Sequence, residues 1–274
     1  MKQLKKMILA LSVILMGLIL ASCAKTSKEK NDDQWNTYVK NKKIVIGFDN
    51  TFVPMGFKNK EGKNVGFDID LANAVFAEYG IEVEWQPITW SMKEAELDNG
   101  TIDLIWNGYS VTDERKQKVL FSDIYMETEE VLIVKKDSAV MKLSDMADKI
   151  LGAQAASSGY EAFENNPEVL KDIVKDKDAV QYSTFTQAFI DLENDRIDAL
   201  LVDKVYANYY LAQKNETENY RVLSAALESG DFAVGARKSD VTRVQKINDG
   251  IKKLYKVGKF QEISQKWFNE DTAS

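Results

Sequence analysis

Short apolar runs of strand length alternate along this chain with segments of helical periodicity, and this alternation constrains the fold most strongly. Residues 44–48 and 197–202 are mostly β-branched or apolar, whereas apolar side chains within residues 69–79 recur at the spacing of a helix. Residues 102–106 are apolar except for Asp103, and we expect them to form a strand buried on both sides of a parallel sheet. The order predicts an α/β protein with mostly parallel sheets flanked by helices.

One pattern occurs twice. Residues 97–103, Leu-Asp-Asn-Gly-Thr-Ile-Asp, return at 192–198 as Leu-Glu-Asn-Asp-Arg-Ile-Asp, and both read as a helix end, a turn and an apolar strand. Coincidence is one interpretation, because helix–turn–strand patterns are common in α/β proteins. The other is two similar lobes, which would leave a cleft between them, and ligands favour such clefts.

Composition excludes several classes of function. The chain has 43 acidic and 36 basic residues and a formal net charge of −7, the opposite of what binding to phosphate backbones requires. It has no histidine, which removes histidine triads and histidine metal ligands. Its single cysteine can form neither an intrachain disulfide nor a thiolate cluster. We therefore expect no metal, no cofactor and no nucleic-acid partner.

The first 22 residues read as a secretory signal. Three lysines precede an apolar run over residues 7–20, after which the sequence turns polar. The run is short for a membrane-spanning helix, although an uncleaved anchor is the alternative interpretation. The only cysteine, Cys23, follows Leu20-Ala21-Ser22 directly.

This junction resembles the lipobox of bacterial lipoproteins. The resemblance implies cleavage before Cys23 and acylation of its thiol and new amino terminus, and two or more acyl chains give stable anchoring. Residues 23–40 are then expected to form the lipidated N-terminus and a polar tether. The predicted location is outside the cytoplasm, held to the cell membrane by lipid.

Over residues 40–270 the chain resembles the extracellular solute-binding proteins of polar amino-acid ABC transporters. Motifs such as Val65-Gly-Phe-Asp-Ile-Asp-Leu71 and Val111-Thr-Asp-Glu-Arg115 carry the resemblance. The other matching segments are 46–54, 99–103, 121–123, 154–158, 196–199, 258–260 and 266–268. One departure is Ala156, which stands where the family usually has glycine.

The resemblance implies a type II periplasmic-binding fold with two lobes that close on a ligand. Lobe 1 is expected at residues 41–126 and 231–274 and lobe 2 at 127–230, with chain crossings near 126–127 and 230–232. It also implies a monomer that captures a free amino acid and delivers it to an ABC permease, without catalysis. The alternatives are a cyclohexadienyl dehydratase-like enzyme and a sensor domain on the same fold.

Arg115 and Asp203 are the charged candidates for the ligand site. A guanidinium can bind a carboxylate through paired donors, and Thr112 places Arg115 in the first turn of an expected helix. The alternative is an exposed arginine paired with a neighbouring acid. Asp203 ends an apolar strand, where it can cap the next helix or face a ligand. The resemblance implies that Arg115 binds the carboxylate and Asp203 the ammonium group.

Four further candidates would surround the carbon frame and side chain of the ligand. Phe52 and Trp90 are aromatic residues, which would by default belong to the core. However, Phe52 is expected in the loop before Pro54 and Trp90 directly precedes a capping Ser91, so neither lies on a regular apolar face. The resemblance implies that they pack on the ligand. It also implies that Asp49 and Gln154 contact the ligand side chain, which favours a polar or uncharged amino acid.

The remaining candidates are small polar residues. Asn107, Gly108 and Ser110 follow the strand expected over residues 102–106. Their backbone and side chains can bond a ligand there, and Gly108 permits close approach. Ser157 and Ser158 precede an expected helix. There they either cap the helix or present its N–H groups to a carboxylate.

Overall fold

The computed structural model describes residues 34–228 and 230–272. The expected signal peptide, Cys23 and most of the expected tether lie outside these residues. Residues 33–274 form one compact unit. Within it, two five-stranded sheets and a small three-stranded sheet are flanked by helices, so the predicted α/β class is confirmed.

We call the part of the body built on the first five-stranded sheet lobe 1. The strand order is β5 (Glu82–Pro87), β1 (Lys43–Phe48), β6 (Leu104–Ile105), β13 (Gly235–Ala236) and β7 (Leu120–Phe121). β1 pairs in parallel with β5 and β6, whereas β13 runs antiparallel to β6 and β7. The sheet is therefore mostly parallel, with one reversed strand.

Helices cover the lobe 1 sheet and complete its core. They are α2 (Trp35–Asn41), α3 (Phe67–Ala77), the 3₁₀ turn η1 (Trp90–Met92), α4 (Lys93–Asn99), α5 (Asp113–Lys118), α9 (Val241–Lys256) and α10 (Lys259–Phe268). α3, α9 and α10 pack against one another and bury Phe67, Val75, Ile247 and Phe260. The small antiparallel sheet of β2 (Thr51–Phe52), β3 (Gly56–Lys58) and β4 (Asn64–Val65) lies beside α3.

Lobe 2 is the part built on the second five-stranded sheet. Its order is β10 (Ala179–Tyr182), β9 (Leu151–Gln154), β11 (Ala199–Asp203), β8 (Glu130–Lys135) and β12 (Tyr220–Ser224). Only β8 runs against the other four. The flanking helices are α6 (Ser158–Asn165), α7 (Phe185–Glu193) and α8 (Lys204–Lys214), with 3₁₀ turns η2 (Leu143–Met146), η3 (Lys175–Lys177) and η4 (Thr217–Asn219).

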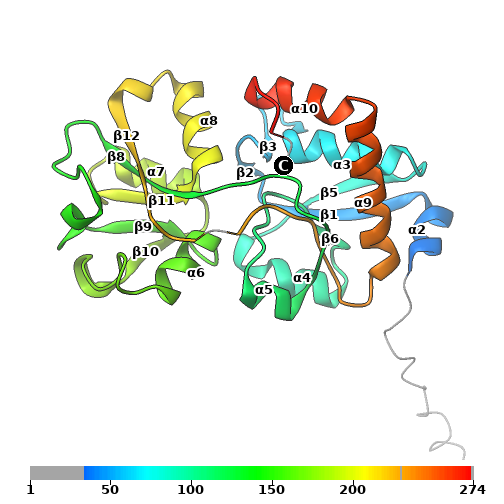
Figure 1. Ribbon diagram of the computed structural model, residues 1–274, viewed down its shortest axis with the longest axis horizontal. Helices are drawn as coiled ribbons and strands as arrows, with labels where there is room; N and C mark the ends of the chain where they lie inside the picture. The colour runs from blue at the N-terminus through cyan, green and yellow to red at the C-terminus, as the bar shows by residue number, and fades with distance from the viewer. Residues whose placement is uncertain (1–33, 229, 273–274) are drawn as a thin grey trace, which may run out of the picture. The chain divides into compact units, whose positions relative to one another are not determined.

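Two antiparallel segments connect the lobes. Met126 and Phe232 form an isolated bridge, in which the Phe232 N–H donates to the Met126 carbonyl at 2.8 Å. The Tyr125 N–H donates in turn to the Phe232 carbonyl at 3.0 Å. In Figure 1 the green and orange segments can be followed as they pass between the lobes. The strand after each crossing, β8 or β13, is the reversed strand of its sheet.

The first described helix differs from the expected tether. α2 packs on lobe 1, where the Trp35 ring meets the Tyr79 ring edge-on with centroids 5.0 Å apart and Tyr38 is buried. The polar segment expected over residues 23–40 therefore ends before this helix. Trp35 and Tyr38 lie three positions apart, on one face of the helix. This short apolar face is hard to recognise in the sequence because most of the residues around it are polar or charged.

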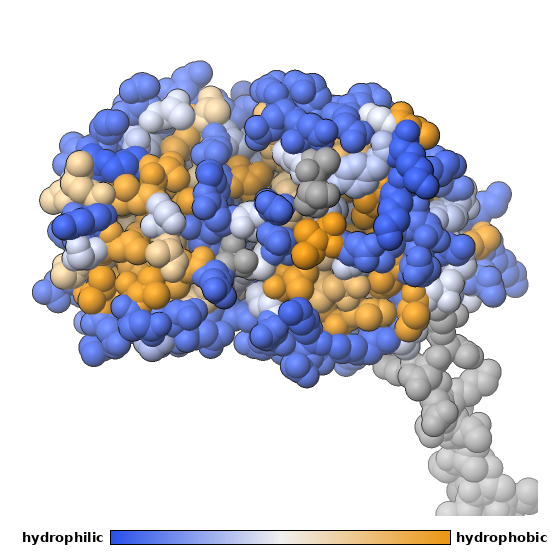
Figure 2. Space-filling model, viewed as in Figure 1, coloured by the Kyte–Doolittle hydropathy of each residue, from blue (hydrophilic) through white to orange (hydrophobic). Residues whose placement is uncertain are grey.

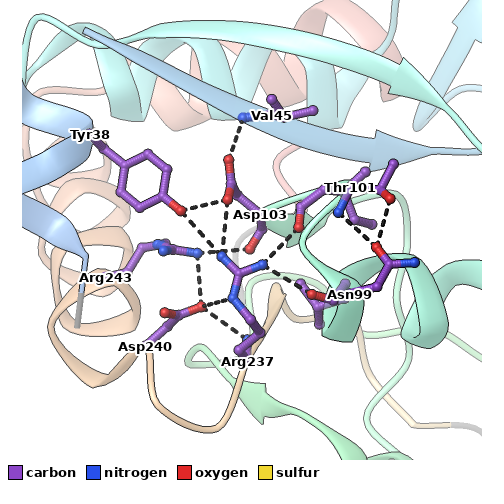
Figure 3. Close-up of polar contacts among 10 residues, drawn as sticks. Tyr38, Val45, Asn99, Thr101, Asp103, Arg237, Asp240 and Arg243 are labelled. Carbon is purple, nitrogen blue, oxygen red and sulfur yellow. Dashed lines mark hydrogen bonds and ion pairs between the residues drawn. The ribbon is translucent and has the colours of Figure 1, made fainter. Parts of the chain in front are cut away.

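Asp103 lies at the centre of a polar cluster that joins three segments of lobe 1 (Figure 3). Its Oδ1 accepts from the Tyr38 hydroxyl at 2.5 Å and from Arg237 Nη2 at 3.0 Å, and its Oδ2 accepts from the Val45 N–H at 3.0 Å. Arg243 Nη1 donates to the Asp103 carbonyl at 2.9 Å. The cluster ties α2 and the start of α9 to the turn before β6.

Figure 2 shows apolar residues gathered in two areas of one face, one over each lobe, with hydrophilic residues along the upper and lower edges.

Candidate functional site

A small pocket lies between the two lobes. It is lined by Asp49, Phe52, Trp90, Asn107, Gly108, Arg115, Gln154, Ser157, Ser158, Phe185 and Asp203. Of the residues expected at a ligand site, Ser110 alone is absent from this lining. The lining comes from loops and helix starts that follow strands of both sheets, the usual place for ligands in α/β folds.

Arg115 is buried at the edge of the pocket, with 3% of its surface exposed. Thr112 Oγ1 accepts from the Arg115 N–H at 3.2 Å, so the expected helix cap is confirmed. The guanidinium lies over the Tyr109 ring, 4.8 Å from its centroid. Its Nη1 donates to the Ser110 carbonyl at 3.0 Å, and its Nη2 crosses to lobe 2 and donates to the Ala156 carbonyl at 3.1 Å.

The alternative of an exposed arginine paired with a sequence neighbour is therefore wrong. Asp113 and Glu114 instead pair with Lys116 and Lys118 on the helix surface. The nearest carboxylate to the guanidinium is that of Glu161 on α6, whose Oε2 lies 3.6 Å from Arg115 Nε. Because a guanidinium has five N–H donors, Arg115 can bind a carboxylate while keeping these contacts.

Asp203 lies on the opposite, lobe 2 side of the pocket, at the end of β11. Its side chain makes no capping bond to α8, so the helix-cap alternative is wrong. Within residues 34–228 and 230–272, its Oδ1 is buried without a hydrogen-bond partner. Burial raises the pKa of Asp203 to about 7, and the positive charge of Arg115 acts in the opposite direction. A cationic group would supply the missing partner.

Of the three candidate serines, Ser110 and Ser158 link the two lobes. Ser157 caps α6, since its Oγ accepts from the Tyr160 N–H at 3.1 Å. Ser110 Oγ donates to Ser158 Oγ at 3.0 Å across the lobe boundary, and Ser158 Oγ donates to Glu130 Oε1 at 2.9 Å. Ser110 thus lies beside the site and holds Ser158, although it does not line the pocket.

Asp49 and Gln154 meet each other across the pocket. Gln154 Nε2 donates to Asp49 Oδ2 at 2.7 Å and to the Ser183 carbonyl at 3.0 Å. Asp49 Oδ1 accepts from the N–H and hydroxyl of Thr51 at 2.9 and 2.7 Å. Burial raises the pKa of Asp49, and these bonds oppose the shift. The two residues form a polar end of the pocket, to which both lobes contribute.

Asn107 and Gly108 form part of the lobe 1 wall. Asn107 Oδ1 accepts from the Asp49 N–H at 3.0 Å, whereas its Nδ2 is buried without a partner among the described residues. Gly108 has a φ of 56°, and a Cβ there would lie 2.6 Å from Phe52 Cε1. Its N–H donates to Asp68 Oδ2 at 2.7 Å. Asp68, in the first turn of α3, therefore holds this loop in place.

Aromatic rings close the rest of the pocket. Phe52 stacks on Tyr206 of lobe 2 with centroids 5.8 Å apart and lies 5.7 Å from Phe185. Trp90 meets Tyr109 edge-on at 5.9 Å. Phe185 is missed by the sequence reading, because a phenylalanine that opens a helix resembles ordinary core. Its position directly after the capping Thr184, at the pocket end of α7, is the signal that could have found it.

Two buried charged residues beside the pocket are also missed. Lys93 is 1% exposed, and its Nζ donates to the Ala156 carbonyl at 3.1 Å and lies 3.2 Å from Glu94 Oε1. Burial lowers the pKa of Lys93 to about 8. Glu130 is likewise 1% exposed, at the start of β8. The sequence pattern does not distinguish either residue from the exposed charged residues next to it.

A two-lobed α/β body, joined by two crossing segments and holding a charged, aromatic pocket between its lobes, defines a solute-binding protein that closes on a small ligand. The comparisons with known proteins agree. Residues 44–270 match the model of the bacterial extracellular solute-binding proteins, family 3, and the chain belongs to this family.

Curated relatives extend along almost the whole chain. The arginine-binding extracellular protein ArtP of Bacillus subtilis (strain 168) is 29% identical over 96% of this chain and 98% of its own. The L-cystine-binding protein TcyJ of Escherichia coli (strain K12) is 30% identical and covers 83% of each chain. The ligands for which these relatives are named differ, so the family alone does not specify one.

Solved structures agree with this assignment. An ABC uptake transporter substrate-binding protein from Streptococcus pneumoniae with bound histidine is 62% identical, with a TM-score of 0.88, over 88% of this chain and 98% of its own. A polar amino acid ABC uptake transporter substrate-binding protein from Streptococcus thermophilus is 60% identical, with a TM-score of 0.59, over 91% and 95%. Along residues 34–228 and 230–272, no helix has the length and apolar character to cross a membrane.

Proposed function

We propose that this protein captures a free amino acid between its lobes and delivers it to the permease of an ABC importer. The observation that carries the proposal is the placement of Arg115 and Asp203, both buried, on opposite walls of one pocket. A guanidinium on one wall and an unpartnered carboxylate on the other match the carboxylate and ammonium ends of an amino acid. Few other small solutes carry both charges.

Closure of the lobes would couple binding to delivery. Lobe 1 brings Arg115 and the aromatic wall, while lobe 2 brings Asp203 and the start of α6, so only the closed form makes all the contacts. A ligand that binds one conformation more tightly shifts the protein toward it. Taking the equilibrium from 1:99 to 99:1 requires about 5.5 kcal/mol of preference. Two desolvated charge pairs, each of which costs about 3–5 kcal/mol when broken, can supply that difference.

The ligand side chain would face the polar end of the pocket, where Asp49 and Gln154 meet and where Asn107 Nδ2 has no partner among the described residues. This favours a polar amino acid. Histidine is the first ligand to test, because the 62% identical protein of known structure contains it.

We assign no catalytic step to this site and take the protein to act as a monomer. If the protein were instead a dehydratase-like enzyme, it would convert its bound substrate to product. Mass spectrometry of each amino acid after incubation with the protein should recover it unchanged, and sedimentation should give the mass of a single chain.

Affinity measurements on charge variants test the assigned roles. Arg115→Ala and Asp203→Ala should each weaken binding of L-histidine by two to four decades in calorimetry, because a ligand charge is left unpaired in a dry pocket. Arg115→Lys should also bind weakly, since an ammonium lacks the paired donors. Arg196→Ala, at an exposed arginine of lobe 2, is the control and should bind like the parent.

Near-parental affinity in either pocket variant would remove its assigned role. A large fall in the melting temperature of the unliganded protein would instead identify a structural role for the residue.

The lipid anchor is a separate part of the proposal and rests on the sequence around Cys23. Cys23→Ser should abolish acylation and release the protein from the membrane fraction of a bacterial host. An unmodified Cys23 in the membrane-associated parent protein, seen by mass spectrometry, would contradict the anchor and leave the binding role intact.

A further inference from the structure

Two acidic side chains lie next to each other at the lobe 2 end of the site. Glu130 on β8 and Asp203 on β11 are directly opposite in the antiparallel ladder, so their side chains leave the sheet on the same face. Glu130 is 1% exposed and Asp203 is 4% exposed. In the described part of the chain, neither Glu130 Oε2 nor Asp203 Oδ1 has a hydrogen-bond partner.

The surroundings of this pair provide too little positive charge for two carboxylates. Arg115 is the cation that acts on both acids, and two of its N–H groups are already bonded to backbone carbonyls. Its Nε also lies near the carboxylate of Glu161. Two lysines of the described residues are engaged elsewhere: Lys93 bonds the Ala156 carbonyl, and Lys204, next to Asp203 in the chain, pairs with Glu129 at the surface.

Packing around Glu130 excludes water. Ser158 Oγ donates to its Oε1 at 2.9 Å, and the first turn of α6 lies so close that a Cβ on Gly159 would be 2.7 Å from Oε2. Burial raises the pKa of Glu130 well above its ordinary value, and the adjacent Asp203 raises it further. Like charges placed directly opposite in a ladder destabilise it, so two ionised acids are disfavoured here.

We propose that Glu130 and Asp203 form a proton-sharing pair, in which one proton is always retained and a second is released when the amino group of the ligand binds. This inference rests on the proposed function. The ligand arrives with its ammonium group already protonated, one carboxyl of the pair gives its proton to water, and no bond within the ligand changes. The retained proton keeps Glu130 neutral, so the site presents one negative charge to one ammonium group.

The pair makes ligand affinity depend on pH in a defined direction. Asp203 has a pKa of about 7, so a proton competes with the ammonium group below that pH. Affinity should then fall by up to tenfold for each pH unit below 7, and it should level off above pH 8.

Infrared difference spectroscopy detects protonated carboxyls directly. We expect the unliganded protein at pH 8 to show a buried carboxylic-acid band that Glu130→Gln removes and Glu161→Gln leaves in place. Adding L-histidine at pH 6.5 should remove a second carboxylic-acid band and leave the Glu130 band unchanged. The imidazole of the probe has no carbonyl and adds no band of this kind.

Affinity of the same variants completes the test. Because glutamine is nearly isosteric with a protonated glutamate, Glu130→Gln should bind L-histidine within about threefold of the parent at pH 8. A loss of a hundredfold or more, with the fold intact, would show that Glu130 is ionised and overturn the proposal. If the Glu130→Gln protein folds poorly, Ser158→Ala offers a second variant, which should shift the Glu130 band without removing it.

The outcomes separate the two proposals. Absence of binding by any amino acid would contradict the proposed function, while the Glu130 band, read without ligand, would still test the retained proton. Binding of L-histidine with no loss of a carboxyl band at pH 6.5 would overturn the proton release alone.

Discussion

The two lobes share a local scaffold and differ in what they attach to it. Asp103 in lobe 1 and Asp198 in lobe 2 follow matching turns. Each accepts from a backbone N–H in or directly before the neighbouring strand, that of Val45 in β1 at 3.0 Å or that of Ile150 before β9 at 2.8 Å. Each also donates its own N–H back to the same residue at 2.8 Å. The repeat seen in the sequence is therefore a structural repeat, and coincidence is the wrong interpretation.

The difference lies around these acids. Asp103 is surrounded by Tyr38 and Arg237, whereas Asp198 has one further contact, with Lys149 at 3.6 Å, and 35% of its side chain is exposed. At the cleft, lobe 1 contributes the buried cations Lys93 and Arg115 and lobe 2 the buried acids Glu130 and Asp203. Apart from the buried acid Asp49 on lobe 1, a common scaffold thus carries opposite charges to the two walls of one pocket.

The largest expected effect comes from breaking the repeat on one side. Asp103→Ala leaves Arg237 and Tyr38 without their shared acceptor, and we expect the free energy of unfolding to fall by about 3–5 kcal/mol. Asp198→Ala removes chiefly one hydrogen bond to a backbone N–H, with an expected loss of about 1–2 kcal/mol. Urea unfolding of both variants measures the difference, and equal losses would mean that the lobe 1 cluster adds no stability.

A second prediction concerns the buried cations of lobe 1. The pKa of Lys93 is lowered to about 8, so between pH 8 and 10 the unfolded chain binds more protons and the free energy of unfolding rises with pH. Lys93→Met removes this buried charge and should stabilise the unliganded protein by about 1–3 kcal/mol at pH 7. It should also flatten the stability profile between pH 8 and 10, measured by urea unfolding at several pH values.

The contact between Lys93 and the Ala156 carbonyl would be lost in the same variant. A net destabilisation at pH 7 would show that this contact between the lobes outweighs the burial of the charge. Lys116→Met, at an exposed position of α5, is the matched control and should change stability little.

A third prediction tests the likeness of the lobes. A Cβ on Gly47 would lie 2.4 Å from Ile102 Cδ1, and one on Gly152 would lie 2.5 Å from Ile197 Cδ1. Gly47→Ala and Gly152→Ala should therefore each destabilise by about 1–2 kcal/mol, since the side chain must move. Adding Ile102→Val or Ile197→Val, which removes that methyl group, should recover part of the loss in a double-mutant cycle. Full additivity in either lobe would contradict the packing described.

The smallest expected effect lies at the start of α6. Ala156 has a φ of 58°, a conformation that costs a residue with a Cβ about 1–2 kcal/mol. Glycine avoids this strain, but it loses more backbone entropy on folding, which offsets part of the gain. Ala156→Gly should gain about 0.5 kcal/mol in thermal unfolding. Ala153→Gly, in the regular strand β9, should lose about 1 kcal/mol, and a similar loss at both positions would remove the argument from backbone strain.

The sequence predicts the architecture well because alternating strand and helix patterns are local signals. The strand expected over residues 102–106 is paired only over Leu104–Ile105, because Ile102 lies in the preceding turn and fills the space beside Gly47. α2 is missed because a seven-residue helix with two buried aromatic residues has almost no periodicity to detect.

The positions of the site residues could be predicted from the same local signals, because these residues end strands or begin helices. The binding roles of those residues stay predictions. The sequence does not show which residues of different strands lie next to each other. Glu130 and Glu129 look alike in the chain, and only the register between β8 and β11 places Glu130 opposite Asp203. In the same way, the burial of Lys93 depends on lobe 2 contacts far away in the sequence.

The antiparallel bridge between Met126 and Phe232 has a consequence for the order of assembly during synthesis. Lobe 2 is interposed within lobe 1, and β13, which fills the lobe 1 sheet between β6 and β7, is made more than a hundred residues after β6. Every strand of lobe 2 therefore leaves the ribosome before lobe 1 can close its sheet. The lobe that begins second can be completed first, and the partly formed lobe 1 has an unpaired β6 edge until residues 235–236 arrive.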